Sequence, residues 1–108
     1  MDEYRKKAEA ALNFLSSTDQ DVVALERQYK DLEQAYKETK AAIIKTADGS
    51  VEMKKATAEI HELTQEAWKK AQDAWQEWRN LYMRRDSAER RWEDWRSINS
   101  SRKQGGSL

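Results

Sequence analysis

Apolar residues recur at a strict seven-residue interval between Val51 and Ile98, with no Pro or Gly inside that stretch. The repeating positions are Met53, Ile60, Ala67, Ala74, Leu81, Ala88 and Trp95. A heptad repeat of this length is typical of one long helix whose apolar seam keeps facing a partner helix. The pattern therefore predicts a continuous helix over residues 51–99.

A second seam lies upstream, over residues 19–47, where apolar or small positions alternate by three and four. Its members are Val22, Leu25, Tyr29, Leu32, Tyr36, Thr39 and Ile43. Two charged pairs in the favoured i,i+4 order, Glu26–Lys30 and Glu33–Lys37, indicate a solvated face away from this seam. The spacing predicts a second helix that packs through one stripe.

Residues 2–16 also carry a helical pattern, with apolar residues on one face. These are Tyr4, Ala8, Ala11, Leu12 and Leu15. Thr18, three residues before Asp21, resembles a capping box, so we predict a helix break at residues 16–18. The alternative is an uninterrupted helix, because the seven-residue phase extends back through Leu15 to Ala8.

The segment Ala47-Asp48-Gly49-Ser50 joins the two long helices. Gly49 suits the left-handed position past a helix end, and Ser50 can cap the next helix. So short a connection predicts antiparallel neighbours. Residues 19–47 then reach only to about Trp78, and the N-terminal helix has the right length to cover residues 80–98.

The expected fold is all-α: an elongated, coiled-coil-like antiparallel helical hairpin with a short N-terminal helix, in a single domain over residues 1–99. The tail, residues 100–108, is small, polar and contains two of the three glycines. We expect this tail to be flexible.

The helix over residues 51–99 carries more apolar surface than one neighbour can bury. Besides the seven-residue repeat, a flanking stripe comprises Trp68, Ala71, Trp75, Trp78 and Tyr82. Two stripes call for two neighbouring helices, and a hairpin supplies one. We therefore expect self-association into a helical bundle, most simply as a two-fold dimer. The residues expected to form the core or self-association seam are Ile60, Leu63, Trp68, Ala71, Trp75, Trp78 and Leu81.

Composition narrows the class of protein. The charged residues balance at 20 basic and 20 acidic, but residues 79–103 hold eight basic against four acidic. There is no Cys, and hence neither a disulfide nor a thiolate site. No apolar run approaches the length of a membrane span, and the N-terminus lacks the apolar stretch of a signal peptide. We expect a cytoplasmic protein that binds no membrane and no small molecule.

Catalytic chemistry has little support in the sequence. His61 is the only His, and the residue three before it is Ala58, so the Glu-x-x-His signature of dimetal bundles is absent. There is no phosphate-binding Gly-rich loop and no nucleophile motif. We predict a protein that is not an enzyme and that needs no cofactor or metal.

The basic last third combines cations with aromatic rings, which suits either a partner protein or single-stranded nucleic acid. The candidate residues are Tyr82, Arg84, Arg85, Arg90, Arg91, Trp92, Trp95, Arg96, Arg102 and Lys103. The plainer reading is that the Trp are core and the Arg lie over them, since Trp92–Arg96 and Arg91–Trp95 have i,i+4 spacing.

The C-terminal stretch from Trp95 to Gly105, the opening Ser17–Val22 and the turn Asp48–Val51 resemble small helical proteins encoded by tailed bacteriophages. Such proteins belong to the early, non-structural region of those genomes, often near recombination genes. The resemblance implies a bacterial host cytoplasm and a role in phage DNA metabolism or in blocking a host system. It supplies no catalytic residues.

The sequence leaves three functional hypotheses. The first is a non-catalytic phage accessory protein that acts by protein–protein contact, in recombination or by inhibiting a host nuclease or defence complex. The second is a single-stranded nucleic-acid-binding protein that uses residues 82–103. The third is a purely structural helical spacer.

Overall fold

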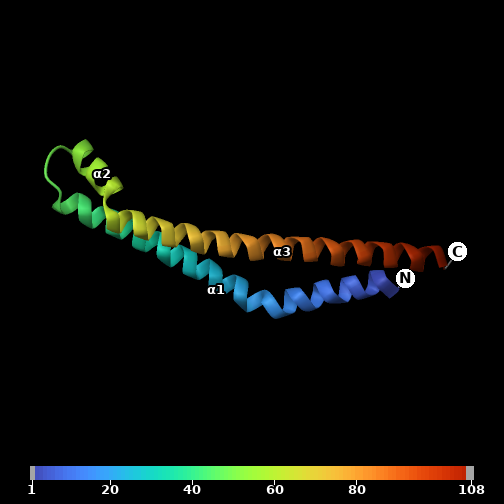
Figure 1. The fold of residues 1–108 in the computed structure, drawn as a ribbon. Coiled ribbons are helices and arrows are strands. Elements are labelled where there is room, and N and C mark those ends of the chain that lie inside the picture. The colour runs from blue at the N-terminus through green and yellow to red at the C-terminus, as the bar shows by residue number, and fades with distance from the viewer. Residues whose placement is uncertain (1, 107–108) are drawn as a thin grey trace. The chain divides into compact units, whose positions relative to one another are not determined.

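A computed structural model of the chain describes residues 2–106, with side chains described over residues 3–101. Within this part the protein has three helices and no strand (Figure 1). They are α1 (Asp2–Thr46), α2 (Val51–Ile60) and α3 (Glu62–Gly106). The predicted all-α helical hairpin is confirmed.

Helix α1 runs without interruption through residues 16–18, so the predicted break and the separate N-terminal helix are wrong. The hydroxyls that suggested a cap bond back within the helix instead. Ser17 Oγ and Thr18 Oγ1 both donate to the carbonyl oxygen of Phe14, at 3.1 and 2.6 Å. A Ser or Thr satisfied in this way can sit inside a helix and need not start one.

The connection after α1 follows the predicted turn chemistry. Gly49 has φ 103°, in the left-handed region that a residue with a Cβ adopts only under strain. Ser50 is the N-cap of α2, and its side chain accepts a hydrogen bond from the Met53 amide at 3.2 Å. The reversal of the chain therefore rests on these two adjacent residues.

The predicted continuous helix over residues 51–99 is wrong, because it is broken at His61. His61 has an extended backbone, with φ −64° and ψ 136°. Its Nδ1 accepts from the Leu63 amide at 3.1 Å, and its carbonyl accepts from the Gln65 amide at 3.0 Å. One residue thus ends α2 and caps α3. As a result Met53 and Ile60, the first two positions of the repeat, are exposed.

The far end of α3 also differs from the expectation. The helix extends to Gly106, so the predicted helix end at residue 99 is wrong. Residues 107 and 108 of the predicted flexible tail lie outside the described residues.

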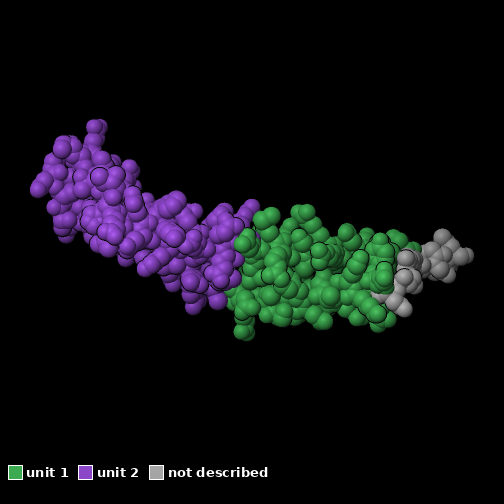
Figure 2. Space-filling model, viewed as in Figure 1, with its two compact units in different colours: residues 1–22, 80–108 green, residues 23–79 purple. Residues whose placement is uncertain are grey.

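The chain divides into two compact units (Figure 2). Unit 1 comprises Met1–Val22 and Asn80–Leu108, and unit 2 comprises Val23–Arg79. In unit 1 the N-terminal part of α1 covers the C-terminal part of α3, as predicted: Arg85 on α3 donates to the Leu15 carbonyl on α1. Unit 2 contains residues 23–46 of α1, all of α2 and residues 62–79 of α3.

Small residues form the core of both units. The fully buried positions are Ala8, Ala11 and Ala88 in unit 1, and Ala58, Thr64, Ala71 and Ala74 in unit 2. The predicted seam of α1 is half-buried over its whole length, and the repeat of α3 faces inward from Ala67 onward. No large side chain among the described residues is fully buried. Alanine at the contact positions permits close approach of the helices, and larger side chains lie at the edges.

Candidate interaction surfaces

Unit 2 leaves several of its largest apolar side chains in solvent. Trp68 is 51% exposed and Trp75 is 38% exposed. They are seven residues apart on α3, which places them on one side of the helix about 10.5 Å apart. Met53, Ile60 and Leu63 are exposed as well. We call these five residues the apolar set of unit 2.

The predicted core seam is therefore divided. Ala71 is buried and Trp78 and Leu81 are half-buried, whereas Ile60, Leu63, Trp68 and Trp75 are exposed. Trp78 packs against Tyr29 of α1, with 5.0 Å between ring centroids and 43° between ring planes. Trp75 instead has Arg79 over its ring at 5.9 Å. The four exposed members are accessible to a partner. Of the other three, only Ala71 belongs to the buried core.

A hollow of about 510 Å³ lies beside Trp68. Its lining is mixed: Tyr36 and Trp68 supply rings, and Lys40 and Glu59 form an ion pair at 3.5 Å. Thr64 also lines it, and its buried hydroxyl has no hydrogen-bond partner among the described residues. An open hollow next to a half-exposed Trp is a place where a partner's side chain can insert.

Arg85 in unit 1 is held by contacts with α1. Its guanidinium donates to the Leu15 carbonyl at 2.8 Å and to Thr18 Oγ1 at 2.6 Å, and it pairs with Asp19 at 2.5 Å. Its side chain is only 18% exposed. These contacts join α3 to α1, so Arg85 leaves the candidate surface predicted from the sequence.

Two other candidate arginines are paired on their own helix. Arg90 bonds Asp86 at 3.1 Å, and Arg96 bonds Glu93 at 3.2 Å, both on exposed parts of α3. Such pairs are screened by solvent and stabilise the helix by a few tenths of a kcal/mol. They also reduce the positive charge that these arginines present to a ligand.

The aromatic rings of the basic end differ in exposure. Trp92 and Trp95 are half-buried and stack on each other, with 5.6 Å between centroids and 21° between planes. Tyr82 is exposed. Neither Trp belongs to the buried core. Arg102 and Lys103 fall outside the described side chains.

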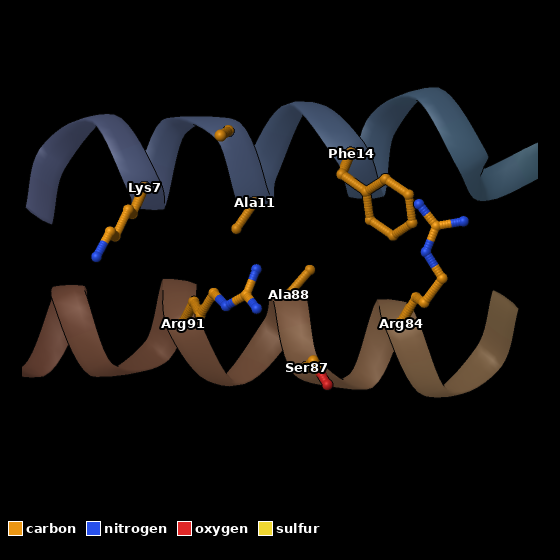
Figure 3. Close-up of a pocket in the computed structure, with 8 residues that line it drawn as sticks. Lys7, Ala11, Phe14, Arg84, Ser87, Ala88 and Arg91 are labelled. Atoms are coloured by element: carbon orange, nitrogen blue, oxygen red, sulfur yellow. The ribbon is translucent and has the colours of Figure 1, made fainter. Parts of the chain in front are cut away.

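Arg84 and Arg91 line a groove between α1 and α3 of unit 1, together with Lys7 (Figure 3). Arg84 lies over the Phe14 ring, with its Cζ 4.8 Å from the centroid. Lys7 and Arg91 extend from opposite helices into the space between them. The groove holds about 640 Å³, and the rest of its lining is uncharged: Ala10, Ala11, Phe14, Ser87 and Ala88.

Sequence reasoning missed Lys7 and Phe14 as parts of this groove. Their seven-residue separation matches that of Arg84 and Arg91, so the pairs meet once α1 continues through residues 16–18. Lys7 and Phe14 both flank the apolar face predicted for residues 2–16, so the pattern did not assign them to a contact with α3. With an unbroken α1, the pairing of Leu15 with Arg85 places Lys7 near the level of Arg91.

The described part of the chain contains no group of three or more His, Cys, Asp or Glu side chains arranged to hold a metal ion. None of its helices combines the length and apolar character that crossing a membrane requires. Comparison of the chain with protein-family models, with curated protein sequences and with solved structures yields no match.

Proposed function

We propose that this is a non-catalytic protein that acts through protein–protein contacts, made first of all by the apolar set of unit 2. This proposal rests on one observation: small side chains are buried, and large apolar side chains are exposed. The buried core is Ala and Thr, while Trp68 and Trp75 lie in solvent. Trp is the side chain that contributes most to protein interfaces, and large exposed apolar groups mark binding sites.

A second copy of the chain is the first partner that we propose. The exposed residues Trp68 and Trp75 belong to the stripe for which the sequence required a second neighbour. Burying one such ring against its two-fold mate contributes roughly 1.5–3 kcal/mol before the cost of association. Two such rings on one helix face would be the anchors of an isologous interface, and the other exposed members of the apolar set would add to its buried area.

We further propose a tailed-phage origin and action in the bacterial cytoplasm, either in phage recombination and DNA metabolism or as an inhibitor of a host nuclease or defence complex. The support is the resemblance of the stretch from Trp95 to Gly105 to small early-region phage proteins. In that setting the dimer would present its remaining exposed residues to a phage or host protein.

Affinity capture from the bacterial host tests the contact surface. We expect the double variant Trp68→Gln, Trp75→Gln to lose the partner that the unaltered protein retains, because both anchors are removed from solvent-exposed positions. The variant Val23→Gln is the control, since Val23 is an exposed apolar residue of unit 2 outside the apolar set.

Far-UV circular dichroism is the folding control: the unaltered protein and both variants should have the same helix content. Retention of the same partner by the double variant would contradict the proposal. Recovery of no specific partner by any of the three proteins would support the structural spacer instead.

A further inference from the structure

We propose that the groove of unit 1 lined by Lys7, Arg84 and Arg91 binds the phosphate backbone of single-stranded nucleic acid. This goes beyond the proposed function, which rests on protein contacts of unit 2. It also redefines the basic surface suggested by the sequence, because it adds a residue of α1 and removes Arg85, Arg90 and Arg96.

The charge of the groove is the first argument. Three cations line it and no carboxylate does. None of the three forms an ion pair within the described part of the chain, whereas Arg85, Arg90 and Arg96 each do. Cations without a carboxylate partner can neutralise phosphates and release the counterions condensed on the nucleic acid, which drives phosphate-backbone binding.

The spacing of the cations is the second argument. Arg84 and Arg91 lie seven residues apart, about 10.5 Å along α3. A stacked strand advances about 3.4 Å per nucleotide, so the two arginines can meet phosphates about three nucleotides apart. Lys7 faces this row from α1, and Figure 3 shows it across the groove from Arg91.

The floor of the groove favours a nucleic-acid backbone over an acidic peptide. Ala10, Ala11 and Ala88 offer no deep apolar pocket, and the Phe14 ring is already covered by Arg84. A peptide interface depends on apolar anchors in fitted pockets. A phosphate backbone needs only well-placed cations, and no ring in the groove is open for reading bases. Binding should therefore be independent of base sequence.

Fluorescence anisotropy with a labelled oligothymidylate tests the inference on the full chain. With three phosphate contacts, the slope of log K against log salt should be about −2, so affinity should fall about 20-fold between about 50 and 200 mM salt. The triple variant Lys7→Gln, Arg84→Gln, Arg91→Gln should bind at least tenfold more weakly at 50 mM salt and lose most of this slope.

The matched control is Lys6→Gln, Arg90→Gln, Arg96→Gln, which removes the same number of positive charges from exposed positions of the same two helices outside the groove. It should keep both the affinity and the slope. If the groove variant unfolds, Arg91→Gln alone serves, because Arg91 has no hydrogen bond or ion pair among the described residues. That single variant should make the slope of log K against log salt less negative by about 0.7.

Several outcomes would overturn the inference. One is the absence of binding to oligothymidylate at 50 mM salt. Another is an equal loss of affinity in the control, which would show that general charge and not the groove is responsible. A third is displacement of the oligonucleotide by polyglutamate at equal charge concentration, which would show that the groove takes acidic peptides.

Discussion

The adjacent residues Arg84 and Arg85 make different contacts. Arg85 points into unit 1 and holds three acceptors on α1, while Arg84 lies over Phe14 at the edge of an open groove. Both residues look alike in the sequence. They differ because a helix turns about 100° per residue, so one faces the neighbouring helix and the next faces the groove.

We expect Arg85→Ala to lower the free energy of unfolding by about 2 kcal/mol, since a charged donor and its cross-helix acceptors are lost together. Urea unfolding followed by circular dichroism measures this. Arg90→Ala is the control, because its exposed pair with Asp86 contributes only a few tenths of a kcal/mol. Equal losses in the two variants would show that Arg85 does not join the helices.

The two charged pairs that the sequence predicted on the solvated face of α1 are both formed. Lys30 bonds Glu26 at 2.9 Å and Lys37 pairs with Glu33 at 3.3 Å. The hydrogen bond from Lys30 to Glu26, together with the negative charge of that carboxylate, raises the pKa of Lys30 above its ordinary value. Lys30 therefore remains charged near neutral pH, and its pair with Glu26 does not make stability depend on pH there.

At the scale of the helices, the sequence located the turn but was wrong at three other places: the predicted break at residues 16–18, the break at His61 and the end of α3 at Gly106. Gly49 and Ser50 act locally, so their chemistry is readable without tertiary structure. Thr18 is equally able to cap a helix or to bond back to Phe14, and only its contact with Arg85 from α3 shows which role it has. The break at His61 was hidden because the seven-residue repeat continues across it unchanged.

His61 is expected to stabilise the start of α3. The variant His61→Ala removes the acceptor of the Leu63 amide, so the free energy of unfolding should fall by about 1 kcal/mol. His61→Asn should restore most of it, because Asn is a preferred N-cap residue. Urea unfolding of both variants checks this. A His61→Ala protein as stable as the unaltered one would contradict the capping role.

At the scale of the whole molecule, the periodicity predicted the helical class and the antiparallel pairing but not which apolar stripe faces inward. A heptad pattern counts Ala and Trp alike as apolar. The structure buries Ala71 and Ala74 and leaves Trp68 and Trp75 exposed, because the small side chains allow the helices to approach. The division into two units was also beyond the pattern, since the repeat of α3 passes from one unit to the other without a change.

The central claim is that the exposed Trp of unit 2 make protein contacts, beginning with a second copy of the chain. Sedimentation velocity over a range of micromolar concentrations tests it most directly, because no unidentified partner is needed. The unaltered protein should pass from monomer to dimer as concentration rises, and the double variant Trp68→Gln, Trp75→Gln should remain monomeric. A clean monomer throughout for the unaltered protein, or a dimer that persists in the double variant, would contradict the claim.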